Sequence, residues 1–279
     1  MNSLMRVPCS YQGGKQRIAA QIVDHLLEAA PGPNSRFYDL CCGSGAISIE
    51  LVNRGIDPSR IWMLDISTWG TFWSRIGTGS FNMDVFDKLI SNLPSDKRDF
   101  KAHMLALSAI PIGDNEVELY PLLQASSFGG KQIWRKEERW ANACFRDYWE
   151  PTETSVRRSP ANPMQPSAAE LRRRIDSLVT GMKGVTGLNI DIMELLNSPL
   201  PNDSIVYIDP PYQSTTKYAF NFDLPSFINR FNEINHQVPL FISEGTPLNS
   251  DALMLNFGGA NGGISGARKV KHQEWLSRF

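Results

Sequence analysis

Cysteine and histidine are scarce in this chain of 279 residues, which has four of each. The cysteines, Cys9, Cys41, Cys42 and Cys144, show no CxxC spacing, and the histidines are scattered. Neither a disulfide framework nor a zinc site is therefore expected. We predict that no metal is bound and that the thiols are reduced.

Long apolar runs and a strong net charge are also lacking. No run approaches the roughly 18 apolar residues of a membrane span, and the first residues contain no apolar signal core, so we expect a cytoplasmic protein. The formal net charge is −1, so binding to nucleic acid would depend on local basic patches. The length suits one large α/β domain or a domain with a substantial insertion.

The most informative stretch is an apolar segment of strand length, residues 204–208, followed by Asp209-Pro210-Pro211-Tyr212. The two prolines end the strand and hold the backbone rigid. In an open α/β sheet, ligands bind outside the carboxyl ends of the strands, which is where this turn is expected. We predict a rigid corner that presents Asp209, Pro210 and Tyr212 to a ligand.

Such a corner suits transfer to an amine conjugated to a ring, such as the exocyclic amine of adenine. Its nitrogen is a poor nucleophile because the lone pair is delocalised. Asp209 and the carbonyl of Pro210 can each accept one N–H hydrogen bond and draw the nitrogen toward tetrahedral geometry, while Tyr212 stacks on the base. Taken alone, a strand that simply ends in an Asp-Pro turn explains the stretch equally well.

Two glycine-containing segments come earlier in the chain. Gly13 and Gly14 stand with Lys15 before a helical pattern, and a glycine pair there exposes N–H groups to an anion. Taken alone, this segment is better explained as an ordinary loop and helix cap. A short apolar strand, residues 36–40, runs into a glycine-rich turn and then a helix, which is the first unit of a nucleotide-binding fold. A second strand ends at Asp65, where a carboxylate is placed to accept hydrogen bonds from a ribose.

In their order along the chain, these motifs resemble those of the S-adenosylmethionine-dependent DNA adenine-N6 methyltransferases of the Dam type. The resemblance rests on residues 11–15 (YQGGK), residues 39–45 (DLCCGSG), Asp65 and residues 209–212 (DPPY). It implies a doubly wound, mainly parallel, Rossmann-like sheet and methyl transfer from S-adenosyl-L-methionine to N6 of an adenine flipped out of double-stranded DNA. The implied catalytic residues are Asp209, Pro210 and Tyr212. The implied cofactor-binding residues are Tyr11, Lys15, Asp39, Cys41, Gly43, Ser44, Gly45, Asp65 and Asp209.

A further acid precedes the Asp-Pro-Pro turn. We predict a strand over residues 188–192, with Asp191 near the cofactor adenine; a strand-end aspartate without a ligand explains the pattern at least as well. After Asp65 the chain departs from the family, which usually continues with an Asn-rich helix. Here Trp69 and Trp73 stand four residues apart, and core packing on one helical face is the interpretation we favour.

Residues 95–182 are predicted to form an inserted, smaller and largely helical DNA-recognition domain, between residues 1–94 and 183–279 of the catalytic domain. Basic and aromatic residues alternate there, which fits contacts with phosphates and unstacked bases. Arg172, Arg173 and Arg174 fit either such contacts or a solvated helix face. A glycine-rich tail ends in a second basic cluster. The residues predicted to contact DNA are Lys131, Arg135, Lys136, Arg268, Lys269 and Lys271.

Other functions remain open on sequence alone. One is methylation of RNA or of a protein amide, although the YQGGK segment before the cofactor loop favours the DNA adenine group. Another is a catalytically weak or silent DNA-binding or regulatory protein on the same fold. A third is a purely structural α/β module, which would not bind the cofactor. For the DNA enzyme, we expect a monomer or weak dimer in a bacterial or phage-infected cell; its target sequence and any restriction partner stay undefined.

Overall fold

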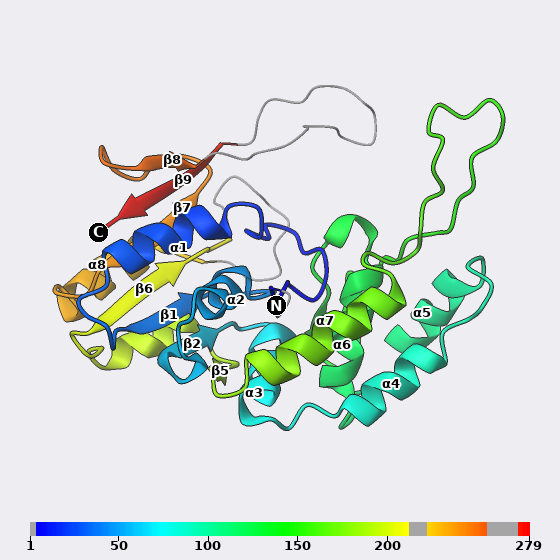
Figure 1. Ribbon diagram of the computed structural model, residues 1–279, viewed down its shortest axis with the longest axis horizontal. Coiled ribbons are helices and arrows are strands. Elements are labelled where there is room, and N and C mark those ends of the chain that lie inside the picture. Colours follow the sequence, from blue (N-terminus) through cyan, green and yellow to red (C-terminus); the bar gives the residue numbers. More distant parts are fainter. Residues whose placement is uncertain (1–3, 212–221, 256–272) are drawn as a thin grey trace.

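The computed structural model describes residues 4–211, 222–255 and 273–279. Within them, a seven-stranded sheet has the strand order β5-β2-β1-β6-β7-β9-β8 (Figure 1). Its strands are β1 (Arg36–Leu40), β2 (Ile61–Leu64), β5 (Thr186–Leu188), β6 (Ser204–Ile208), β7 (Leu240–Glu244), β8 (Leu253–Leu255) and β9 (Glu274–Arg278). The strands predicted before Asp65 and Asp209 are confirmed.

The sheet is mainly parallel, as predicted. Strands β5, β2, β1, β6 and β7 run parallel to one another, and β9 is antiparallel to both β7 and β8. The central strands β1 and β6 are buried on both faces; β6 is apolar after Ser204, whereas β1 also contains Arg36 and Asp39. These features confirm an α/β fold compatible with a Rossmann-like arrangement.

The winding direction reverses next to β1. From β1 the chain proceeds outward through β2 to β5, then crosses back to β6 and continues to β7 on the other side. In open α/β sheets, ligands bind at this switch point, in the crevice beyond the carboxyl ends of the strands. The ends of β1 and β6 are followed here by Cys41 and Asp209, so the predicted motifs meet at the switch point.

Helices cover both faces of the sheet. On one face lie α1 (Ala19–Glu28) and α2 (Ala46–Asn53), whose apolar side chains share a buried cluster with Phe37 and Ile205. On the other face, α8 (Leu224–Ile234) and the 3-10 helix η3 (Ile192–Asn197) bury Leu40 and Ile208. Alternate residues of each strand therefore serve two separate cores.

Helix α3 (Thr68–Thr78) packs closely against the edge strand β5. Trp69 and Trp73 are fully buried in it, so their prediction as core residues is confirmed. The predicted strand over residues 188–192 is wrong in its bounds. Strand β5 ends at Leu188, because Asn189 turns to donate to the carbonyls of Asp65 and Ser67 and Asp191 caps η3.

A helical part lies beside the sheet (Figure 1). Helix α4 precedes residue 95 and packs against α6 and α7, and the buried cluster of the α1 face continues from the sheet into these helices. The domain boundary at residue 95 stays a prediction. The elements of this part are α4 (Met83–Ser91), α5 (Phe100–Ser108), α6 (Glu116–Ser126), η2 (Phe128–Gly130), β3 (Trp134–Lys136), β4 (Arg139–Ala141) and α7 (Ala168–Gly181).

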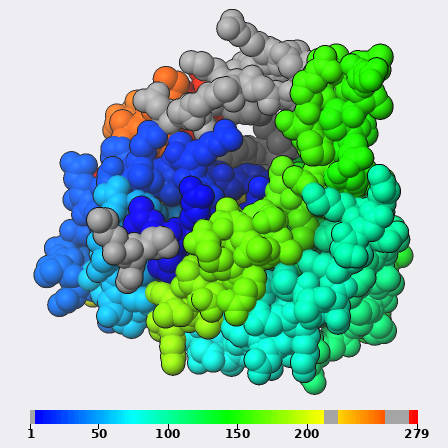
Figure 2. Space-filling view, turned by 45° about the vertical axis from the view of Figure 1, so that its right-hand side comes forward, coloured from blue at the N-terminus to red at the C-terminus, as the bar shows by residue number. Residues whose placement is uncertain are grey.

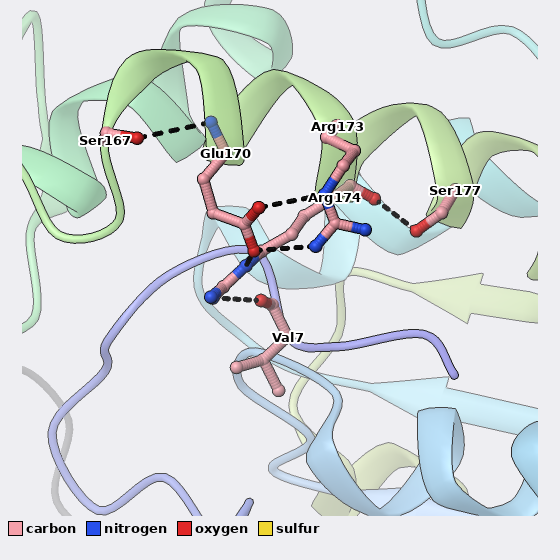
Figure 3. A network of polar contacts seen from close by, with 6 residues as sticks. All are labelled: Val7, Ser167, Glu170, Arg173, Arg174 and Ser177. Carbon is pink, nitrogen blue, oxygen red and sulfur yellow. Dashed lines mark hydrogen bonds and ion pairs between the residues drawn. The ribbon is translucent and has the colours of Figure 1, made fainter. Parts of the chain in front are cut away.

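The arginine run of α7 is engaged within the protein. Glu170 pairs with both Arg173 and Arg174, and Arg174 donates to the carbonyl of Val7 at 3.2 Å (Figure 3). Arg172 forms a two-pronged pair with Asp87 of α4. These contacts tie α7 to α4, and they hold the amino-terminal segment against the helical part. The same amino-terminal segment continues into the predicted YQGGK motif.

Candidate functional site

A pocket of about 370 Å³ lies at the switch point of the sheet. Its walls come from the segment before α1, the ends of β1 and β6, the loops after β1, β2 and β6, the starts of α2, η3 and α8, and one residue of the helical part. Figure 2 shows the molecule hollowed between the blue amino-terminal segment and the green part of the chain. The pocket lies between these two segments, because Tyr11 and Gln132 both line it.

Most of the predicted site residues meet in this pocket. Gly45 does not line it; its φ is +77°, and an added Cβ would lie 2.3 Å from the ring of Trp73, so this glycine serves the packing of α3. Tyr212, Arg268, Lys269 and Lys271 lie outside the described residues. The predicted residues that line the pocket are Tyr11, Lys15, Asp39, Cys41, Gly43, Ser44, Asp65, Asp191, Asp209 and Pro210.

The glycine-rich turn is held from both sides at Gly43. Its N–H donates to Asp65 Oδ2 at 2.8 Å, and its carbonyl accepts from Trp73 Nε1 at 2.9 Å. Its φ is +48°, and an added Cβ would lie 2.9 Å from the ring of Tyr11. A glycine is required here on both counts. Because Asp65 already takes the N–H, this turn does not offer that donor to a phosphate.

Asp65 fixes two segments at once. Beside its bond from Gly43, its Oδ1 accepts from the N–H of Ser67 at 2.8 Å, just before α3. Burial raises the pKa of this carboxyl, and the Ser67 and Gly43 bonds oppose the rise. Each oxygen keeps a second lone pair, which leaves the carboxylate able to accept from a ligand hydroxyl in the pocket.

Asp39, at the end of β1, anchors the first turn of α2. Its Oδ2 accepts from the hydroxyl of Ser48 at 2.7 Å and from the N–H of Ser48 at 3.2 Å. Burial raises the pKa of Asp39 to about 7 against the effect of these bonds, with smaller contributions from the charges of Asp209 and Asp65. The carboxyl therefore titrates near neutral pH.

We expect Asp39→Asn to be more stable than the wild type at pH 7.5 by a few kcal/mol at most, with an advantage that shrinks toward pH 4.5. The folded pKa of Asp39 lies above that of the unfolded chain, so its contribution to stability is present below about pH 4 and lost as the pH rises through about 7. Urea unfolding at several pH values measures the difference. Asp57→Asn is the control. Hydrogen bonds from Ser59 lower the pKa of exposed Asp57, so the difference in unfolding free energy between Asp57→Asn and the wild type should stay constant over this pH range. A stability difference between Asp39→Asn and the wild type that does not change with pH would contradict the prediction.

Asp209 and Lys15 form a buried ion pair across the switch point. Lys15 Nζ lies 2.6 Å from Oδ1 and 2.7 Å from Oδ2 of Asp209, and it also donates to the carbonyl of Gly13 at 3.0 Å. Burial raises the pKa of Asp209 to about 6, and Lys15 opposes the rise. Asp209 is therefore ionised at neutral pH. Its side chain is 20% exposed, which leaves it accessible to a ligand.

Two glutamates extend this pair at the sheet edge. Glu274, at the start of β9, places Oε1 3.6 Å from Lys15 Nζ. Glu244, at the end of β7, is buried and accepts from the N–H of Gly245 at 2.9 Å, while its Oε2 has no partner among the described residues. Both glutamates raise the pKa of Asp209. Sequence inspection missed them because their strands are distant in the chain and neither belongs to a motif.

The charged groups around the pocket are predominantly acidic. Among the described residues that line it, Lys15 is the one basic side chain, and it is already paired with Asp209. Five aspartates line the same space: Asp39, Asp65, Asp191, Asp209 and Asp223. Such a pocket disfavours an anionic ligand and favours one with a positive charge.

The predicted DNA contacts of the helical part differ in their surroundings. Lys131 and Lys136 are exposed. Arg135 is held inside: its Nε lies 3.0 Å from Glu116, and its guanidinium stacks 4.2 Å from the ring centre of Trp140. Lys131 and Lys136 are therefore available to an external partner, whereas Arg135 is committed to an internal pair.

Comparison with known proteins adds no family assignment. No protein-family model matches this chain, and no curated protein matches it. In the part of the chain that the structure describes, no helix has the length and apolar character that crossing a membrane requires. Nor does this part contain a group of histidine, cysteine or acidic side chains arranged to hold a metal ion.

Proposed function

We propose that this protein transfers a methyl group from S-adenosyl-L-methionine to the exocyclic N6 amine of an adenine in DNA. The main support for this proposal is the acidic pocket at the switch point. An ionised Asp209 and the two prolines that follow it line this nucleotide-sized space. The motif resemblance supplies the reaction, and the geometry supports it independently through the chemistry of the pocket.

The donor set of the pocket fits S-adenosylmethionine better than a phosphate-bearing nucleotide. The N–H of Gly43 is taken by Asp65, and Lys15 by Asp209, so two donors that a phosphate would use are engaged. The aspartates suit a ligand with a cationic sulfur and an amino group. All three of Asp39, Asp65 and Asp191 line the pocket, and in this proposal Asp65 would hold the ribose hydroxyls, Asp191 the adenine and Asp39 the methionine amine. When bound, this group supplies an electrophilic methyl on a positively charged sulfur.

The acceptor amine would be held by the turn after β6. The carboxylate of Asp209 accepts one amine hydrogen and the carbonyl of Pro210 the other, which orients the nitrogen lone pair away from the ring plane. Lys15 keeps Asp209 ionised and fixed while this happens. The amine loses one proton in the reaction, and Asp209 is placed to receive it first. An adenine in a duplex must leave the stack, at a cost of about a few kcal/mol.

We assign DNA recognition to the helical part, residues 95–182. Lys131 directly precedes Gln132, which lines the pocket, and Lys136 follows it by four residues; neither lysine forms an ion pair among the described residues. An arm between the bridged residues Trp149 and Ala161 projects from the body and carries Arg157 over the ring of Trp149 (the green loop of Figure 1). These cations offset the acidic pocket where a phosphate backbone would run.

We expect the protein to bind S-adenosylmethionine and to bind ATP or NAD at least about tenfold more weakly, because about 1.4 kcal/mol of charge repulsion suffices for a tenfold difference. Isothermal titration calorimetry at low and physiological salt measures both affinities. Tighter binding of ATP than of S-adenosylmethionine would contradict the assignment of the pocket.

Transfer itself is tested with methyl-labelled S-adenosylmethionine and unmethylated DNA. Label in N6-methyladenine supports the proposed function. Label in RNA or in a protein amide, with none in DNA, selects the other enzymes that share this amine chemistry. Donor binding and DNA binding without transfer indicate a silent regulatory protein, and absence of donor binding rejects the methyltransferase altogether.

A further inference from the structure

Gln132 is a buried polar side chain that no other contact explains. It lines the pocket from the helical part and is 7% exposed. Its backbone carbonyl accepts a hydrogen bond, but within the described residues its carboxamide makes none. The carboxamide atoms are also not among the unpaired polar atoms that are sealed inside the protein. The carboxamide is therefore not sealed in the interior, and the pocket is the cavity that Gln132 lines.

The backbone around Gln132 is clamped in place. Gln124 donates to the carbonyl of Lys131 at 2.9 Å and accepts from the N–H of Ile133 at 3.1 Å. Asn142 donates to the carbonyl of Gln132 at 2.7 Å, and Tyr120 donates to the carbonyl of Ile133 at 3.1 Å. Four hydrogen bonds from three side chains thus fix a short segment whose central side chain is left unpaired. This arrangement is typical of a preorganised ligand contact.

The position of Gln132 points to the acceptor base. Among the described residues of 95–182, Gln132 alone lines the pocket. The segment is also joined to the amino-terminal motif, because Gln12 donates to the carbonyl of Gly130 at 2.8 Å. The part of the protein assigned to DNA therefore borders the pocket through one residue, Gln132.

We propose that Gln132 is a specificity-determining residue whose Nε2–H donates a hydrogen bond to a ring nitrogen of the target adenine, N1 or N7. This rests on the proposed function. Asp209 and Pro210 occupy both amine hydrogens, so the remaining polar groups beside the amine are acceptor nitrogens, which need a donor. The aspartates of the pocket are acceptors when ionised and cannot fill that role. A carboxamide can, and glutamine is a common reader of adenine edges.

The test combines a variant with altered bases. Methyl transfer by the full-length wild type and by Gln132→Ala is measured on duplexes made with adenine, 7-deazaadenine or 1-deazaadenine. We expect Gln132→Ala to lower kcat/KM on ordinary DNA about tenfold. We expect the wild type to lose a similar factor on one of the two analogues, and Gln132→Ala to lose nothing further on that same analogue, because the contact is already absent.

Gln132→Glu and Gln237→Glu provide the matched pair. Glutamate at position 132 replaces the donor by an acceptor, so we expect a loss of about 100-fold, whereas exposed Gln237 lies before β7 at the opposite edge of the sheet and its substitution should leave kcat/KM unchanged. The KM for S-adenosylmethionine should stay within about twofold in all variants. A wild-type rate for Gln132→Ala, equal analogue losses in both proteins, or a rise confined to the donor KM would overturn the inference. Failure of the wild type on every DNA would instead reject the proposed function.

Discussion

Asp209→Ala is expected to lower methyl transfer to adenine-containing DNA by about 10³-fold or more. The substitution removes the carboxylate that holds the acceptor amine, and loss of one oriented polar group at a reacting centre commonly costs 10²–10³ in kcat. It also leaves Lys15 buried without its closest counter-ion. Single-turnover transfer from labelled donor to unmethylated DNA measures the loss. Full activity of Asp209→Ala would refute the assignment of the site.

The pH dependence of the wild type gives an independent check on Asp209. Burial raises its pKa to about 6, so the carboxylate is present above that pH and protonated below it. A protonated oxygen does not accept the amine hydrogen, and kcat/KM should therefore fall as the pH decreases through about 6. Asp209→Asn should remain folded and lose this dependence along with most of the activity. Thermal unfolding and donor titration show whether the variants retain the pocket.

Gly187→Ala is expected to destabilise the fold by at least about 3 kcal/mol. A Cβ at this position in β5 would lie 2.1 Å from the N of Ser74 and 2.3 Å from the carbonyl carbon of Trp73, both in α3. Because these are backbone atoms, no change of rotamer relieves the overlap. The helix must move off the strand, and the next residue of that strand, Leu188, accepts the N–H of Asp65.

Gly32→Ala is the matched control for this change. No atom lies within 4 Å of a Cβ added at Gly32, so its stability should stay within about 0.5 kcal/mol of the wild type. Denaturant unfolding of both variants gives the comparison, and recovery of Gly187→Ala only in the insoluble fraction would agree with the expected loss. Equal stabilities would show that α3 is not seated on β5 as described.

The strands that position the site could be predicted from local sequence. The segments at 36–40 and 204–208 are short apolar runs bounded by turn residues, and each is buried on both faces in the sheet. The strand predicted over 188–192 was wrong in its bounds. Apolar and polar residues alternate there as in a strand, but the course of the chain is set by a distant contact, the bonds of Asn189 to Asp65 and Ser67. Local periodicity does not carry such information.

The residues of the site likewise fall into two groups, those that local sequence predicts and those that only the fold shows. Motif residues such as Lys15, Asp39 and Asp209 were found because each belongs to a recognisable motif at the boundary of a predicted helix or strand. Gln132 and Glu244 were not, since a single glutamine or a single strand-end glutamate has no distinguishing pattern, and only the fold shows which polar groups are buried beside the pocket. The pairing of Lys15 with Asp209, 194 positions apart, likewise depends on tertiary structure.

Strand β9 couples the outer part of the sheet to the electrostatics of the pocket. It is inserted between β7 and β8, and it brings Glu274 to within 3.6 Å of the Lys15 ammonium. Among the described residues, β9 is the strand that pairs with β8, and the charge of Glu274 raises the pKa of Asp209. Local unfolding of β9 would therefore detach β8 and change the charge around Asp209 while every motif of the pocket stays in place.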